Sequence, residues 1–116
     1  MLKTAFLEIS KSKFYSYGND FSTLDEFEVF LQNLKKEHKK ATHFCFAYII
    51  DDCGTKEKSS DDHEPRGCAG APIMNVIKRK GLRNYGIIVV RYFGGTKLGA
   101  GGLLRAYSKS ASLLFN

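Results

Sequence analysis

An aliphatic run at residues 85–91, Tyr-Gly-Ile-Ile-Val-Val-Arg, limits the folds open to this chain more than any other feature. Unbroken apolar runs of this kind are typical of interior strands that are covered on both faces. A glycine-rich segment follows, and from about Gly101 apolar residues recur at helical spacing (Leu103, Leu104, Tyr107, Ala111, Leu114 and Phe115). The chain therefore needs a sheet that contains this strand and a helix that packs against it.

Two more helices are predicted upstream of this strand. Residues 23–26, Thr-Leu-Asp-Glu, have the form of a capping box, and apolar residues follow at helical spacing as far as the basic run at 35–40. Lysines there complement the negative end of the helix dipole, which is a structural reason for their presence. A second helix is predicted over 71–80, with Pro72 in its first turn and Gly81 at its end.

The other segments are predicted to be strands and one loop. Residues 43–50 are rich in aromatic and aliphatic side chains and predict a buried strand. Residues 51–67 are polar and contain Gly54, Pro65 and Gly67, so we expect a loop there, the most mobile part of the chain. Residues 3–10 and 14–18 are expected to form one strand or a hairpin.

This order of elements predicts an α/β fold, more closely an α+β two-layer sandwich with a mixed sheet and helices on one face. The chain has 116 residues, of which 43% are hydrophobic, and we expect a single domain over residues 1–116. Apolar runs that approach the roughly 20 residues of a membrane span are missing, so we expect a cytoplasmic protein with no membrane contact. Three cysteines without C-x-x-C spacing favour reduced thiols over a disulfide framework or a zinc site.

The formal net charge of +6 is unevenly distributed. Residues 51–66 hold six acids and three bases, a net charge of −3, which leaves +9 for the rest of the chain. A basic surface of this kind favours RNA, ribosomal or acidic protein partners, although solubility alone is an equally good explanation.

The glycine-rich segment between the strand at 85–91 and the last helix is a candidate anion site. It contains five glycines and three cations, but it matches neither the phosphate loop G-x-x-x-x-G-K-[ST] nor the dinucleotide fingerprint G-x-G-x-x-G. Glycine-rich starts of helices direct several N–H groups toward one place, which attracts anions such as a phosphate-bearing small molecule. The predicted ligand-binding residues are Arg91, Gly94, Gly95, Lys97, Gly99, Gly101, Gly102 and Arg105.

A second candidate site is the acid block formed by Asp61, Asp62 and Glu64. Three carboxylates so close together could bind Mg²⁺, accept hydrogen bonds from arginine, or lie on a solvent-exposed loop. Arg91 or Arg105 could pair with one of these acids instead of binding an external anion. The predicted roles of Cys68 and of the three histidines are ordinary packing or surface positions, and no residue stands out as a nucleophile or general base.

Two segments together resemble the YigZ/IMPACT family. Residues 91–107 carry the family series Arg-Tyr-Phe-Gly-Gly, Leu-Gly-Ala-Gly-Gly-Leu and Arg-Ala-Tyr, and residues 61–70 resemble its block Asp-Asp-Gly-Glu-Pro-Ser-Gly-Thr-Ala-Gly. Weaker similarity occurs at residues 11–14 and 43–48. His63, Arg66 and Cys68 depart from the family pattern, and a histidine in place of a glycine at 63 calls the local backbone into question if a positive φ is needed there.

The resemblance implies a fold like the second domain of a small-subunit ribosomal protein. It also implies a non-catalytic regulatory binding module, since eukaryotic IMPACT proteins regulate translational control through a protein partner. Bacterial members usually carry a further ferredoxin-like domain after residue 107, which we expect to be absent here. Three hypotheses follow: a binding module that contacts RNA, a ribosome-associated protein or another protein; a phosphate-binding enzyme with Mg²⁺; or a glycine segment that only packs against the acid block.

Overall fold

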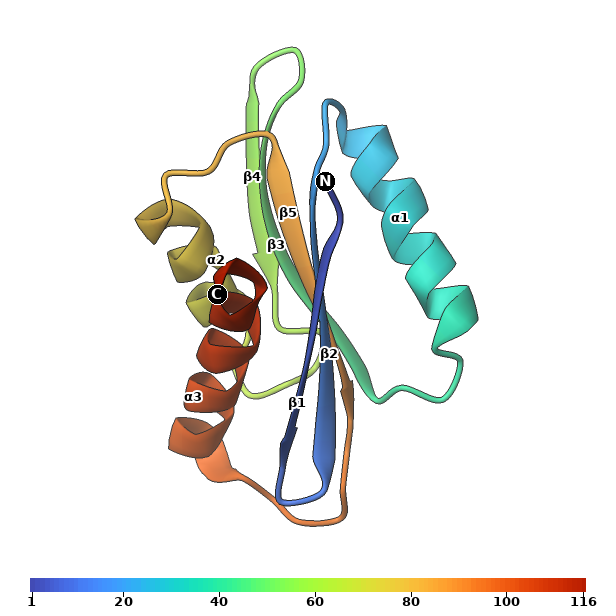
Figure 1. The fold of residues 1–116 in the computed structure, drawn as a ribbon, viewed down its shortest axis with the longest axis vertical. Helices are drawn as coiled ribbons and strands as arrows, with labels where there is room; N and C mark the ends of the chain where they lie inside the picture. The colour runs from blue at the N-terminus through green and yellow to red at the C-terminus, as the bar shows by residue number, and fades with distance from the viewer.

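The chain folds into one five-stranded sheet with three helices, and the computed structural model describes residues 1–116 (Figure 1). The first half contains strands β1 (Lys3–Ile9) and β2 (Ser12–Asp20), helix α1 (Leu24–Glu37) and strand β3 (His43–Asp51). The second half contains strand β4 (Thr55–Ser60), helix α2 (Gly70–Arg79), strand β5 (Tyr85–Tyr92) and helix α3 (Gly99–Ser112), and a short 3-10 turn follows at Leu113–Phe115. The α+β class predicted from the sequence is confirmed.

The sheet has the order β1-β2-β5-β3-β4, and every neighbouring pair is antiparallel. The prediction of a mixed sheet was therefore wrong in this detail. The error arose at residues 55–60, which are predicted to lie in a loop but form strand β4, paired with β3. This extra strand reverses the chain before α2, so that β5 runs antiparallel to β3 where a direct β3-α2-β5 crossover would have made the two strands parallel.

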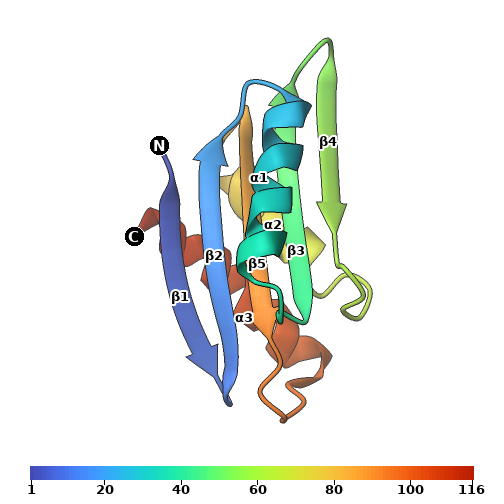
Figure 2. The same ribbon diagram turned by 90° about the vertical axis from the view of Figure 1, so that its right-hand side faces the viewer.

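Helices cover both faces of the sheet. Figure 2 shows α1 across β5 and β3 on the near side, with α2 and α3 behind the sheet. The expectation of helices on one face was wrong, and the burial of β5 explains why: residues 87–90 are at most 1% exposed, so both of its faces need a cover. The prediction that this strand is buried on both faces is confirmed.

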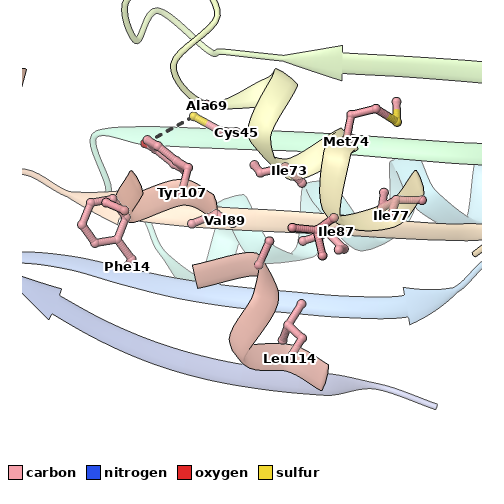
Figure 3. Close-up of a cluster of buried hydrophobic side chains, with 14 of the residues drawn as sticks. Phe14, Cys45, Ala69, Ile73, Met74, Ile77, Ile87, Val89, Tyr107 and Leu114 are labelled. Carbon is pink, nitrogen blue, oxygen red and sulfur yellow. Dashed lines mark hydrogen bonds between the residues drawn. The ribbon is translucent and has the colours of Figure 1, made fainter. Parts of the chain in front are cut away.

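Two hydrophobic cores follow from this arrangement. The larger core lies between the sheet and the pair α2 and α3, where Ile73 and Ile77 of α2 meet Ile87 of β5 and Tyr107 of α3 (Figure 3). The smaller core lies under α1 and is built largely from aromatic rings, with Phe27 as its most buried helical member. The sheet thus separates two hydrophobic cores, one on each face.

Local signals in the sequence set most of the boundaries of the elements. Thr23 caps α1 and Glu26 returns the hydrogen bond, so the predicted capping box is present. The N-terminal segment forms a hairpin whose two turn residues, Ser10 and Lys11, both have positive φ, 48° and 68°. Such a pair of positive φ values matches the twist of antiparallel strands in a two-residue hairpin.

Candidate functional site

A buried carboxylate, Glu64, is the centre of a hydrogen-bond network on the α3 side of the sheet. It lies in the turn between β4 and α2, and its side chain is only 3% exposed. Arg91 donates from Nη1 to both carboxylate oxygens, at 3.0 and 2.7 Å, and the hydroxyl of Tyr107 donates to Oε2. These donors compensate the loss of water around the charge, which a buried carboxylate requires.

Arg91 is held from several sides at the end of β5. Its guanidinium carbon lies 5.6 Å from the ring centroids of Phe14 and of Phe93. Its Nη2 donates to Ser12 Oγ at 3.2 Å, and the same oxygen accepts from the backbone N–H of Gly94 at 3.2 Å. Of the two roles considered for Arg91, the internal ion pair is therefore the one that the contacts show.

Two further groups extend the network into the core. Cys45 Sγ lies 3.4 Å from the Tyr107 hydroxyl (dashed in Figure 3) and 3.1 Å from the carbonyl oxygen of Asp61. Burial raises the pKa of the Tyr107 hydroxyl well above its usual range, with Cys45 and Glu64 adding to the shift. Burial likewise raises the pKa of the Cys45 thiol. Both groups therefore keep their protons and serve as donors.

Asp61 of the acid block holds the start of α2. Its carboxylate accepts from the backbone N–H groups of Gly67, Ala69 and Gly70, at 2.9, 3.1 and 2.8 Å. Burial raises the pKa of this carboxyl, but the three hydrogen bonds together outweigh burial, so the pKa lies below its ordinary value. An internal carboxylate thus occupies the positive end of α2.

Asp62 connects the acid block to β3. Its carboxylate accepts from the N–H of Phe44 at 2.6 Å, and its carbonyl accepts from Nδ1 of His43 at 2.7 Å. Nε2 of His43 then lies 3.5 Å from Glu64 Oε1. The backbone needs positive φ both at Asp62 and at His63, 40° and 71°, which explains why the family pattern has glycine at position 63.

The acid block is therefore built to accept internal donors. Asp61 and Asp62 bind backbone N–H groups, and Glu64 binds Arg91 and Tyr107. No three His, Cys, Asp or Glu side chains come together as a metal site. The contacts match the arginine-pairing alternative for Glu64, and they leave no shared position between the three carboxylates for Mg²⁺.

A cleft of about 360 Å³ opens beside this network. Its polar lining is His43, Glu64, Arg91 and Lys97, and the remaining lining residues come from Pro65, Phe93 and the start of α3 (Leu98, Gly99, Ala100 and Leu103). Another depression, of about 340 Å³, lies between α2 and α3 and contains none of the predicted ligand-binding residues. The cleft is therefore the place where the predicted site and the buried network meet.

The N-terminal end of α3 contributes positive potential to the cleft. No side chain caps this helix, and its first turn contains no acidic residue, in contrast to the start of α2 with Asp61. Gly99 and Ala100 of the first turn line the cleft, and the exposed side chain of Lys97 lies beside them. A helix dipole with free N–H groups and an adjacent ammonium group attracts an anion.

The five predicted glycines have different roles. A Cβ added to Gly94 would lie 2.1 Å from the backbone carbon of Lys11, so this glycine allows β5 to approach the β1-β2 turn. Gly95 and Gly99 have open space around them but φ values of 90° and 72°, which other residues adopt only with strain. Only Gly99 of these three lines the cleft.

Arg105 and the last two glycines lie beyond the cleft. The guanidinium of Arg105 is exposed and lies along the first turn of α3, where a Cβ at Gly101 would meet Nη1 at 3.4 Å. A Cβ added to Gly102 would lie 3.3 Å from the Cβ of Leu98. The structure thus brings Arg91, Lys97 and Gly99 together and leaves Arg105 outside the group.

Sequence reasoning missed His43 and Tyr107 as parts of the site, together with Ser12 and Phe93. His43 was expected to have an ordinary role because no partner stands near it in sequence; its partners Asp62 and Glu64 are contributed by a different turn. The available signal was the family resemblance, since all four segments that carry it, residues 11–14, 43–48, 61–70 and 91–107, meet at this network.

Comparison with known proteins agrees with this convergence. The family described as the Impact N-terminal domain matches residues 10–115, nearly the whole chain and all four segments. The chain belongs to the IMPACT family. Its similarity to the IMPACT family member YvyE of Bacillus subtilis is 48% identity over 104 residues, which covers 90% of this chain and 48% of that protein. Its identity to the IMPACT family member YigZ of Escherichia coli is 35% over 106 residues, which covers 90% of this chain and 52% of that protein.

Solved structures share the fold. The chain superimposes on a crystal structure described as a hypothetical protein with a TM-score of 0.91 and 32% identity, over 97% of this chain and 56% of that one. It also matches the two-domain translational regulator Yih1 with a TM-score of 0.59 and 23% identity, over 97% of this chain and 43% of that one. This second likeness establishes the shared fold alone. The chain spans about half the length of the curated IMPACT relatives that it matches.

Proposed function

We propose that this chain is a non-catalytic regulatory binding module that acts in translation in the cytoplasm, and that the cleft beside Glu64 binds an anionic group of a ribosomal or ribosome-associated partner. Membership of the IMPACT family and the fold shared with a protein described as a translational regulator support the link to translation. No helix of the chain has the length and apolar character needed to cross a bilayer.

The observation that carries the proposal is that an internal carboxylate caps the N-terminus of α2 but not that of α3. An internal carboxylate, Asp61, accepts from the N–H groups at the start of α2, whereas the start of α3 has no such partner and lines a cleft with Lys97 and His43. The carboxylate in that cleft, Glu64, is already paired with Arg91 and Tyr107. The cleft therefore presents positive groups whose neighbouring negative charge is compensated.

Co-sedimentation with purified bacterial ribosomes tests this function. We expect retention at low salt that falls steeply as salt rises, because phosphate contacts release counterions. Lys97→Ala should weaken retention, whereas Lys109→Ala, an exposed lysine near the other end of α3, should leave it unchanged. Absence of retention at low salt, or equal losses from the two variants, would contradict the proposal.

The size of the cleft supports a second candidate, a phosphate-bearing small molecule. About 360 Å³ lies within the usual range for small-molecule sites, and the lining combines polar side chains with apolar ones. A thermal-shift screen of nucleotides and phosphorylated metabolites, with and without Mg²⁺, distinguishes the two. A specific ligand at 100 times its Kd adds about 2.7 kcal/mol of stability. No stabilisation by any of them would exclude this candidate.

A further inference from the structure

The sheet face on the α1 side carries a cluster of aromatic rings and lysines outside the cleft. We call it the aromatic platform and define it by Phe6 of β1, Lys13 and Tyr15 of β2, Tyr92 of β5 and Lys11 in the β1-β2 turn. A depression of about 300 Å³ is lined by Lys11, Lys13, Tyr15 and Tyr92, and by Phe93, which also lines the cleft. Figure 2 shows that α1 lies over β5 and β3 and leaves the turn end of the β1-β2 hairpin uncovered.

Strand register places the rings of the platform side by side. Phe6 is directly opposite Tyr15, and Lys13 is directly opposite Tyr92. The ring centroids of Phe6 and Tyr15 are 4.9 Å apart, and those of Tyr15 and Tyr92 are 5.7 Å apart. Phe6 is 50% exposed, and the two tyrosines are partly exposed. The platform is therefore a continuous aromatic surface that is partly open to solvent.

His38, the C-cap of α1, fixes the orientation of the platform tyrosines from the α1 side. Its Nδ1 lies 2.6 Å from the Tyr92 hydroxyl, and its Nε2 lies 2.7 Å from the hydroxyl of Tyr17. Its ring also packs against Tyr15 at 5.3 Å. Rings held in this way lose little conformational freedom when another ring stacks on them.

The charges around the platform are mainly positive. Lys11 and Lys13 lie within it, and Lys39 and Lys40 follow His38 directly in sequence. The acids in its vicinity are Glu8, opposite Lys13, and Glu37, beside His38. Aromatic residues are common in both protein and nucleic-acid interfaces, but lysine is depleted from protein interfaces and frequent where phosphates bind.

We infer that the aromatic platform binds single-stranded RNA, with bases stacked on Tyr15, Tyr92 and Phe6 and with phosphates near Lys11 and Lys13. Stacking on exposed rings together with a basic track is the general chemistry of single-strand recognition, and sheet surfaces provide it in other folds. The choice of RNA as the strand rests on the proposed function in translation. The inference adds to that function a second surface, separate from Lys97 and the start of α3.

Binding of a fluorescently labelled RNA 10-mer of mixed sequence, measured by anisotropy on the whole chain, tests the platform. We expect Tyr15→Leu to weaken binding about tenfold, because it removes a stacking ring but keeps an apolar side chain. Lys13→Gln should lower the slope of log K against log salt by about 0.7. The chain has six tyrosines and no tryptophan, so the part of the tyrosine quenching on RNA addition that is lost in Tyr15→Leu reports stacking on the platform.

Matched controls lie on the other side of the sheet. Phe115→Leu removes a ring that also lies near lysines, Lys3 and Lys80, and Lys109→Gln removes an exposed lysine of α3. Neither should change RNA affinity by more than about twofold, and circular dichroism checks that each variant is folded. Should Tyr15→Leu fail to fold, the salt dependence of RNA binding by the exposed Lys13→Gln variant still decides the question.

Several outcomes would overturn the inference: no RNA binding at low salt, equal losses in the platform and control variants, equal affinity for a duplex, or tighter binding of the same sequence as single-stranded DNA. Anion binding by the cleft is tested separately, by ribosome retention of the Lys97→Ala variant. Ribosome retention that depends on Lys97, together with the absence of any RNA binding that depends on Tyr15, would refute the platform and preserve the proposed function. RNA binding that depends on Tyr15, without retention on ribosomes, would refute the proposed function and preserve RNA binding by the platform.

Discussion

Glu64→Gln should destabilise the protein severely, although the side chain keeps its shape. The change removes the negative charge that faces Arg91, leaves the guanidinium buried without its counterion, and preserves only one carbonyl acceptor for the donors of Arg91 and Tyr107. Arg91 is only 4% exposed, so water cannot replace the lost partner. Removing one member of such a pair costs about 3–5 kcal/mol.

Urea unfolding followed by far-UV circular dichroism measures this loss. With an m-value of about 2 kcal/mol/M, the midpoint should fall by about 2 M while the m-value stays unchanged. The matching decrease in Tm is about 4 °C for each kcal/mol in a domain of this size, or about 12–20 °C in total.

Two further variants test whether burial of the Glu64–Arg91 pair causes this loss of stability. Glu57→Gln breaks an exposed pair with Lys78, whose N···O distance of 3.1 Å is similar, and should cost less than about 1 kcal/mol. The double variant Glu64→Met, Arg91→Met replaces both charges by apolar side chains, and it should be more stable than Glu64→Gln alone. A loss below about 1 kcal/mol for Glu64→Gln would show that the buried pair is not the constraint that its geometry indicates.

Three other predictions test separate features of the fold. Asp61→Asn should lower Tm at pH 7. The difference in Tm from the wild type should shrink as the pH falls through the lowered folded pKa of Asp61, because both side chains are then uncharged; a difference that stays constant as the pH is lowered would contradict this. Gly94→Ala should cost about 3 kcal/mol or more, since its Cβ meets backbone, and Gly95→Ala, with open space but positive φ, should cost only about 1–2 kcal/mol; urea unfolding ranks the two. Cys53 alone should react rapidly with a thiol reagent in the native protein, whereas all three thiols should react in denaturant.

Features set by neighbouring residues were predictable from the sequence. The capping box of α1, Pro72 in the first turn of α2 and the aliphatic run of β5 each act over a few residues, and all three are found in the structure. Strand β4 was missed because it lies at the edge of the sheet and reads Thr-Lys-Glu-Lys-Ser-Ser, which has no apolar side chain. Missing this strand also caused the error in strand direction, since it supplies the reversal before α2.

The candidate site could be predicted only in part. The glycines and cations near α3 were visible as a composition, but the role of each depends on distant segments: Gly94 on Lys11, and Arg91 on Glu64. His43 and Tyr107 gave no local sign of function because their partners lie far away in sequence. Burial and hydrogen bonding between distant segments depend on the whole fold, so they cannot be predicted from the periodicity of one segment.

The position of β5 determines when the fold can be completed during synthesis. The pairs β1-β2 and β3-β4 are local hairpins, but β2 and β3 are joined only through β5, which leaves the ribosome after both. Isolated hairpins are marginally stable, so each would remain weakly formed and would expose an unpaired inner edge during this interval. When β5 emerges, it pairs with both edges and brings Arg91 to Glu64 in the same step. The nascent chain therefore gains most of its stability in a single late step of synthesis.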